Sequence, residues 1–242
     1  MRLLGHRGAS RDFPENTVEA LVAAMEQRAD GVELDVMRCA SGELVVCHDE
    51  VLTRLAGLKL EVRRTRWSEL KHLDVGSRLG FRPARIPLLH DVFDALPARA
   101  WVNVELKCET TEDDGLSEAV GALVTARNLE ERVFISSFNP LCLVRLANAW
   151  PALRRGLLID PDKPWAPQAW FWLPVTARTS VHPHFSQVTA GRINRWHQRG
   201  WEVAAWTVDD VEEARRLRAL GVDWLITNTP GALRERLRSV SG

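Results

Sequence analysis

The sequence has no tyrosine and little lysine, which indicate no function, and it has no long apolar run, which does narrow the class of protein. Lysine occurs only at Lys59, Lys71, Lys107 and Lys163, so most of the positive charge comes from arginine. The 32 basic and 32 acidic side chains cancel, which argues against a broad basic surface for nucleic acid or anionic membrane. No run of about 18 apolar residues predicts a transmembrane helix, and the first residues lack the apolar segment of a signal peptide.

Cysteine is also scarce. The 4 cysteines show no CxxC spacing, so neither a zinc knuckle nor a redox pair is expected. Cys47 and Cys108 stand beside His48 and Lys107, but alternation along a strand predicts that both thiols point away from these neighbours. We therefore expect a soluble protein of the reducing cytoplasm, without a stable membrane anchor and without a nucleophilic thiol.

What the sequence does contain is an alternation of short apolar runs with amphipathic segments of helical length. This alternation favours parallel strands joined by crossover helices. The 242 residues are close to the length of about 250 that is typical of one (β/α)8 barrel. We therefore predict an α/β fold, a single (β/α)8 TIM barrel over residues 1–242. Its strands are expected at residues 2–5, 31–36, 100–106, 132–137, 155–159, 179–182, 202–207 and 223–227.

One stretch departs from the alternation. The apolar run 44–47 follows Val36 after a short Ala-Ser-Gly turn, which predicts a β-hairpin. In this hairpin Asp35 comes to lie near His48. Residues 49–87 then form an insertion with one helix at 67–73, which we expect to be a small cap over one end of the barrel.

Several helix starts carry capping signals. Asn16 is expected to cap the helix 17–28. Asn139 precedes a proline, Asp209 or Asp210 can cap a later helix, and Thr229 precedes the last helix. These assignments are structural and indicate no function.

Charged side chains gather at the expected C-terminal ends of strands, which is where barrel enzymes have their active sites. Glu33 and Asp35 are two residues apart on one strand, so they point to the same side. Two neighbouring carboxylates repel each other unless a cation neutralises them, and a hard divalent ion with oxygen ligands can do so. Glu105 can supply a third carboxylate from the next strand. The alternative is an internal ion-pair cluster with Arg7 and Lys107, which is costly to bury without a task.

Two imidazoles, His6 and His48, are expected near this cluster. Histidine can accept or donate a proton near pH 7. Each would more often be structural if it stood alone, but together beside carboxylates they favour proton transfer. Arg7 offers a planar fork for phosphate oxygens, Lys107 can contact an anionic oxygen, and Gly8 allows the backbone to approach a phosphate.

Aromatic residues near the strand ends allow two interpretations. Trp206 either packs on the C–H surface of a substrate or belongs to the core. Phe138 is more typical of the core, and His182 favours a structural role. The segment 165–175, rich in tryptophan, is expected to be a helix packed on the barrel. An apolar rim for lipid-like substrates and an oligomer contact are its alternatives.

The motifs together resemble one family. The strings HRGAS, PENT, GVELDV, SGELVVCHDE, VNVELK, ISSFNP and AAWTVDD, from His6 to about Pro230, are similar to the glycerophosphodiester phosphodiesterases. The resemblance implies a (β/α)8 barrel that hydrolyses glycerophosphodiesters, such as glycerophosphocholine and glycerophosphoethanolamine, to sn-glycerol 3-phosphate and an alcohol. That chemistry belongs to lipid and glycerol metabolism.

The resemblance also implies roles for individual residues. His6 and His48 would be the acid–base pair, and Arg7 and Lys107 would contact the phosphate. Glu15 would support the site. The ligands of one divalent cation, Mg2+ or Ca2+ with Mn2+ as a further candidate, would be Glu33, Asp35 and Glu105.

Two other functions remain open at this point. One is a lysophospholipase D-like or other lipid-headgroup phosphodiesterase on the same fold. The other is a ligand-binding barrel without turnover, which the intact set of charged residues argues against. The expected partner is a small glycerophosphodiester, and a homo-oligomer is left open. The family's usual pattern is altered at Arg54, which follows the second histidine motif, and at Asp209, and both changes concern substrate preference.

Overall fold

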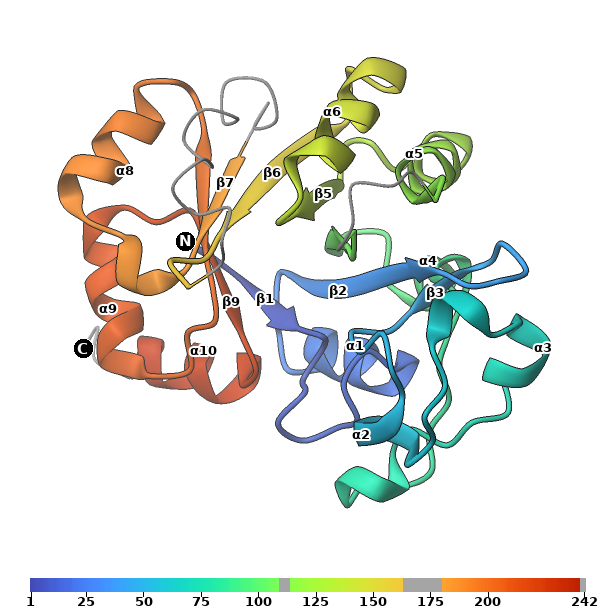
Figure 1. The fold of residues 1–242 in the computed structure, drawn as a ribbon. Coiled ribbons are helices and arrows are strands. Elements are labelled where there is room, and N and C mark those ends of the chain that lie inside the picture. The colour runs from blue at the N-terminus through green and yellow to red at the C-terminus, as the bar shows by residue number, and fades with distance from the viewer. Residues whose placement is uncertain (109–113, 163–179, 240–242) are drawn as a thin grey trace.

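Eight parallel strands form a closed barrel in the computed structural model of the protein, which describes residues 1–108, 114–162 and 180–239 (Figure 1). The strands are β1 (Arg2–His6), β2 (Gly31–Arg38), β4 (Trp101–Leu106), β5 (Val133–Ser137), β6 (Arg154–Ile159), β7 (Ser180–Pro183), β8 (Glu202–Ala205) and β9 (Trp224–Thr227). Their order is β1-β9-β8-β7-β6-β5-β4-β2, and β1 also pairs with β2, which closes the barrel. The predicted (β/α)8 barrel is therefore confirmed.

Helices cover the outside of the barrel, and Figure 1 shows α8, α9 and α10 together on one side of it. The described helices are α1 (Val18–Glu26), α2 (Thr53–Ala56), α3 (Trp67–Leu70), α4 (Leu89–Ala95), α5 (Leu116–Ala126), α6 (Pro140–Ala149), α8 (Ala190–His197), α9 (Val211–Leu220) and α10 (Pro230–Arg238). Short 3-10 turns lie at Val62–Arg64, Ser77–Leu79 and Phe185–Gln187. Among the described residues, no helix has the length and apolar character needed to cross a membrane.

The expected hairpin is formed by β2 and β3 (Leu44–Val46), which pair antiparallel with Val36 opposite Val46. The backbone N–H of Cys47 donates to the carbonyl of Asp35 at 3.0 Å, which brings His48 near Asp35. Residues 49–87 follow and bury an apolar cluster of their own with β3. Helix α3 is shorter than predicted, because beyond it the N–H groups of His72 and Leu73 bond to carbonyls three residues back instead of four.

The capping predictions have mixed outcomes. Asn16 does not cap α1: Thr17 does, accepting from the N–H of Ala20. Asn139 caps α6 as expected, accepting from Leu141 N at 3.0 Å. Asp210 rather than Asp209 caps α9. Thr229 precedes α10, but its side chain makes no capping hydrogen bond.

Aromatic side chains fill the N-terminal end of the barrel. The rings of Trp101 and Trp224 lie 5.2 Å apart, and Phe134 lies 5.3 Å from Trp224. The guanidinium groups of Arg2 and Arg154 lie over Trp101. Because this end is packed with rings and cations, open space is found at the opposite, C-terminal end of the strands.

Candidate active site

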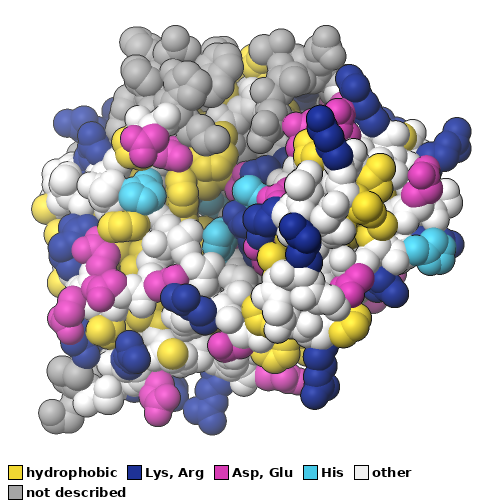
Figure 2. Space-filling view, turned by 60° about the horizontal axis from the view of Figure 1, so that its bottom comes forward, with side chains coloured by type: hydrophobic (Ala, Val, Ile, Leu, Met, Phe, Trp, Pro, Cys, Tyr) yellow, Lys and Arg dark blue, Asp and Glu magenta, His cyan; other side chains and the backbone are white. Residues whose placement is uncertain are grey.

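A cavity of about 440 Å³ opens at the C-terminal ends of the strands. Its walls come from residues at or just beyond strand ends, among them His6 at the end of β1, Lys107 after β4, Phe138 after β5 and Trp206 after β8. Figure 2 shows a hollow on the surface, with cationic and histidine side chains gathered at it and hydrophobic side chains beside them. The location matches the usual position of the active site in (β/α)8 enzymes.

Three buried carboxylates meet at one side of this cavity. Glu33 and Asp35 come from β2, and Glu105 lies directly opposite Asp35 on β4. Glu33 and Glu105 line the cavity, whereas Asp35 is fully buried beside them. Each offers one oxygen, and these oxygens lie within 4.8 Å of one another. Burial and the charges of Asp35 and Glu105 raise the pKa of Glu33 well above its usual range, and burial also raises the pKa of Glu105. The cluster therefore holds more acid than the side chains around it neutralise.

Arg7 and Lys107 are the cations closest to these carboxylates. The Arg7 Nε lies 3.2 Å from Asp35 Oδ2, and its backbone N–H donates to Glu33 Oε2 at 3.0 Å. The Lys107 Nζ lies 3.0 Å from Glu105 Oε1 and 3.6 Å from Asp35 Oδ1. Burial opposes ionisation of Asp35, yet Arg7 and Lys107 outweigh it and lower the pKa of Asp35 to about 2. This carboxylate is thus anionic, while its neighbour Glu33 resists ionisation.

The cluster fits a divalent cation. The Oδ1 atom of Asp35 is buried and accepts no hydrogen bond, and hard cations prefer carboxylate oxygens. Glu33, Asp35 and Glu105 could therefore hold a metal ion, and a divalent charge there would favour ionisation of Glu33.

His6 is held by a short chain of polar contacts. Asn228 donates its amide NH2 to Asp209 Oδ2 at 2.7 Å, so its carbonyl oxygen faces His6 Nδ1, also at 2.7 Å. The proton of neutral His6 consequently lies on Nδ1, and Nε2 points to Glu33, whose Oε2 is 3.9 Å away. Burial and the charge of Arg7 lower the pKa of His6 to about 4. His6 is therefore neutral at pH 7 and presents a lone pair to the cavity.

His48 is oriented by residues at the start of the insertion. Its Nδ1 lies 2.9 Å from Asp49 Oδ1, and Arg54 binds Asp49 at 2.8 Å. Arg54 also binds Glu15 at 2.7 Å, and Glu15 accepts from Arg7 at 2.9 Å. Glu15 does not line the cavity: it joins the two arginines. Glu15, His48 and Asp49 also lie close enough together to bind a metal ion. Arg54, however, already neutralises the carboxylates of Glu15 and Asp49.

Several residues that position the site were not predicted from the sequence. Asn16 was expected to cap a helix, but its amide binds Asp35 twice, donating to Oδ2 at 2.8 Å and accepting from the backbone N–H at 3.1 Å. The PENT motif could have indicated this role. Asn228 could have been found from its place directly after β9. Glycine is required at position 8 for a structural reason, because a Cβ there would lie 2.4 Å from the backbone of Ala20.

The aromatic residues divide between cavity and core. Trp206 lines the cavity, and its Nε1 donates to the carbonyl of His182 at 2.8 Å. Phe138 was expected in the core, but it is half-buried and lines the cavity with its ring centroid 5.5 Å from Trp206. His182 is fully buried beside Phe134 and is bonded to Ser180, in agreement with its structural interpretation. The segment 165–175 lies outside the described residues.

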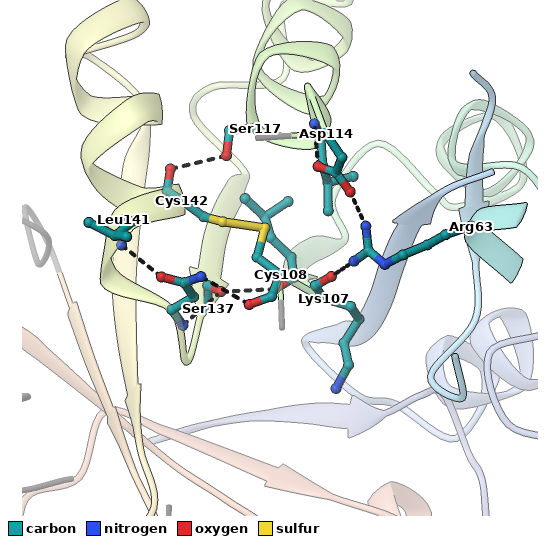
Figure 3. Close-up of a disulfide and its surroundings, with 11 residues drawn as sticks. Arg63, Lys107, Cys108, Asp114, Ser117, Ser137, Leu141 and Cys142 are labelled. Carbon is teal, nitrogen blue, oxygen red and sulfur yellow. Dashed lines mark hydrogen bonds and ion pairs between the residues drawn. A yellow bond between two sulfur atoms is a disulfide. The ribbon is translucent and has the colours of Figure 1, made fainter. Parts of the chain in front are cut away.

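A disulfide joins Cys108 to Cys142 next to the cavity (Figure 3). The predicted reducing setting gave no reason to expect this bond, and the Cα atoms of the two cysteines lie 6.7 Å apart. Cys108 also lines the cavity, contrary to the alternation argument, because β4 ends at Leu106. Figure 3 shows the Lys107 amine pointing away from the disulfide. Cys47 is buried, which raises its pKa to about 12 and agrees with an inert thiol.

Comparison with known proteins gives a consistent result. Residues 6–232 match the family model described as the glycerophosphoryl diester phosphodiesterase family. A glycerophosphodiester phosphodiesterase of Caldanaerobacter subterraneus is 35% identical over 234 residues, which cover 96% of this chain and 95% of the relative. A human lysophospholipase D is 26% identical over 98% of this chain and 85% of its own.

A solved structure agrees with these matches. The phosphodiesterase of Oleispira antarctica, in complex with the product sn-glycerol-3-phosphate, has a TM-score of 0.82 and 28% identity, with 98% of this chain and 96% of that chain covered. The family match, the closed barrel and the charged cavity at its C-terminal end thus point to the same conclusion. The chain belongs to the glycerophosphoryl diester phosphodiesterase family and is a phosphoric diester hydrolase.

Proposed function

We propose that the protein hydrolyses glycerophosphodiesters, such as glycerophosphocholine and glycerophosphoethanolamine, to sn-glycerol 3-phosphate and an alcohol. The observation that carries this proposal is the convergence of three buried carboxylates with two histidines, Arg7 and Lys107 at one cavity. The product in the Oleispira antarctica complex supports the same substrate class.

Glu33, Asp35 and Glu105 are the proposed ligands of one Mg2+ or Ca2+ ion. When bound, such an ion supplies Lewis-acid polarisation of a non-bridging phosphate oxygen. Arg7 and Lys107 reach the same region, so their positive charges would stabilise the negative charge that develops on the phosphoryl group. Trp206 would pack on the C–H surface of the glycerol.

His6 and His48 are the proposed pair for proton transfer. His6 enters the reaction neutral with its Nε2 lone pair facing the cavity, so it can accept the proton of the nucleophile. That nucleophile is either water or the 2-hydroxyl of the glycerol. His48, oriented by Asp49, then donates a proton to the leaving alcohol.

Hydrolysis of a panel of glycerophosphodiesters, with and without EDTA, tests the proposed reaction. We expect sn-glycerol 3-phosphate to form, EDTA to abolish its formation, and Mg2+, Ca2+ or Mn2+ to restore it. Full activity of the metal-free protein would rule out the ion, and the absence of sn-glycerol 3-phosphate would rule out the reaction.

The two histidines are distinguished by the leaving group. His6→Ala and His48→Ala should each lower kcat on glycerophosphocholine by roughly 10²–10⁴, the usual contribution of a general acid or base. A glycerophosphoryl p-nitrophenyl ester releases a phenolate that needs no proton. His48→Ala should therefore lose much less activity on this ester, while His6→Ala should lose as much as before. The reverse pattern would exchange the two roles.

A second candidate function is the release of the headgroup from lysophospholipids. The human lysophospholipase D that the chain resembles favours it, since the catalytic groups could serve both substrates. Lysophosphatidylcholine and glycerophosphocholine compared at equal concentrations distinguish the two functions by their kcat/KM values.

Two further expectations are kept as proposals. We propose that residues 49–87 act as a cap, because Arg54 links the insertion to Glu15 at the site. A cytoplasmic location stays a prediction. The disulfide argues against it, because disulfide bonds persist mainly in oxidising compartments. Alkylation of thiols in intact cells before isolation tests the location: a modified Cys108 indicates the reducing cytoplasm.

A further inference from the structure

The wall of the cavity opposite His6 carries an acidic group for which the proposed reaction has no task. Asp160 follows β6, and β6 lies diametrically across the eight-stranded barrel from β1. Asp160 lines the cavity together with Leu158 of β6 and Phe138 after β5. We name these three residues the headgroup wall.

The carboxylate of Asp160 lacks a cationic partner within the described ranges of the chain. One of its oxygens accepts the backbone N–H of Asp162 at 3.0 Å, and no described Lys, Arg or His side chain forms an ion pair with it. This contrasts with the other side of the cavity, where Arg7 and Lys107 contact the carboxylates of Asp35 and Glu105.

A phosphodiester is an anion, and a carboxylate in its cavity that has no cationic partner among the described residues repels it. The repulsion becomes attraction when the substrate itself carries a positive charge at that end. The ring of Phe138 adds to this attraction, because cations are favoured over aromatic faces. Trp206 supports the ring by an edge-to-face contact, with centroids 5.5 Å apart at 86°.

We propose that the headgroup wall selects glycerophosphodiesters whose alcohol carries an ammonium group, with Asp160 as the residue that determines this specificity. The proposal rests on the proposed function and refines it from diesters in general to zwitterionic ones. The phosphate would lie between the metal ligands and the wall, with the cationic alcohol directed to Asp160.

The test compares substrates that differ in headgroup charge. We would measure kcat/KM for glycerophosphocholine and for glycerophosphoglycerol, whose alcohol is neutral, in the wild type, in Asp160→Asn and in Asp162→Asn. Asp162 is the matched control, because it is an exposed aspartate two residues away that does not line the cavity.

We expect the wild type and Asp162→Asn to prefer glycerophosphocholine at least fivefold, and Asp160→Asn to bring the ratio close to one. A fivefold ratio corresponds to about 1 kcal/mol at 1.4 kcal/mol per tenfold, the upper range for a partly exposed ion pair. An equal loss on both substrates would overturn the proposal and assign Asp160 to the glycerol they share. An unchanged ratio would overturn it as well.

Binding separates this proposal from the reaction. Calorimetric titration of the two diesters into His48→Ala, with and without Asp160→Asn, measures the preference without turnover. If no diester is hydrolysed by the wild type, the proposed reaction fails, but a preference for glycerophosphocholine that disappears with Asp160→Asn still supports the headgroup wall. Equal affinities for both diesters in His48→Ala would refute it.

Discussion

Asn16 should govern both the stability of the fold and the affinity of the metal site, because it is the side chain that holds Asp35. Its amide is almost fully buried and makes two hydrogen bonds to this residue, at 2.8 and 3.1 Å. Its φ of 58° lies in the left-handed region, which glycine adopts without strain. Asn16→Gly therefore removes the side chain and leaves the backbone free to keep its course.

The expected loss follows from these two contacts. A hydrogen bond to a charged group contributes about 1.5–3 kcal/mol and a neutral one about 1 kcal/mol. Asn16→Gly should thus lower the free energy of unfolding by about 2.5–4 kcal/mol. Side chains that orient metal ligands typically change metal affinity by about 10- to 100-fold, so the Kd for Mn2+ should rise by a factor in this range.

Urea denaturation followed by circular dichroism measures the stability, and calorimetric titration of Mn2+ measures the affinity. Asn128→Gly is the matched control, because Asn128 also has a positive φ, 54°, but is exposed and far from the site in sequence. It should change stability by less than about 0.5 kcal/mol. If Asn16→Gly behaves like Asn128→Gly in both assays, the reasoning about Asp35 is refuted.

Two other properties can be predicted from buried groups. Replacing both Cys108 and Cys142 by serine should lower the free energy of unfolding by about 3.5–4 kcal/mol, because the bond spans 34 residues; dithiothreitol should destabilise the wild type equally and leave the double variant unchanged. Burial lowers the pKa of His182 to about 3. Between pH 6.5 and pH 3 the folded state therefore binds fewer protons than the unfolded state. The free energy of unfolding consequently falls as the pH falls through this window. Between pH 7 and pH 5 the wild type should lose about 2 kcal/mol more than His182→Gln, and parallel losses in urea titrations would exclude this explanation.

The sequence was sufficient to predict the barrel and the meeting of three acidic side chains in it. Strands of a closed parallel barrel are covered on their outer side by helices and packed on their inner side, so each appears as an apolar run. Glu33, Asp35 and Glu105 interrupt such runs at spacings that fix their direction. The structure brings these three acids together as the spacing indicated.

Other features depended on contacts that no local pattern encodes. Asn16 and Thr17 are both good capping residues, and the buried contact with Asp35 decides which of them caps α1. Phe138 and Cys108 follow the last residues of their strands, where alternation no longer sets the direction of a side chain. The partner of Cys108 lies 34 residues away on α6, where the carbonyl of Cys142 accepts from Ser117 of α5.

The position of the ion is the central claim, and an anomalous difference map from a crystal soaked in Mn2+ tests it most directly. The account predicts one strong peak within about 2.5 Å of carboxylate oxygens of Glu33, Asp35 and Glu105, with Nε2 of His6 facing the same cavity. A peak beside Glu15 and Asp49 instead, or none among the three buried acids at saturating Mn2+, would contradict it.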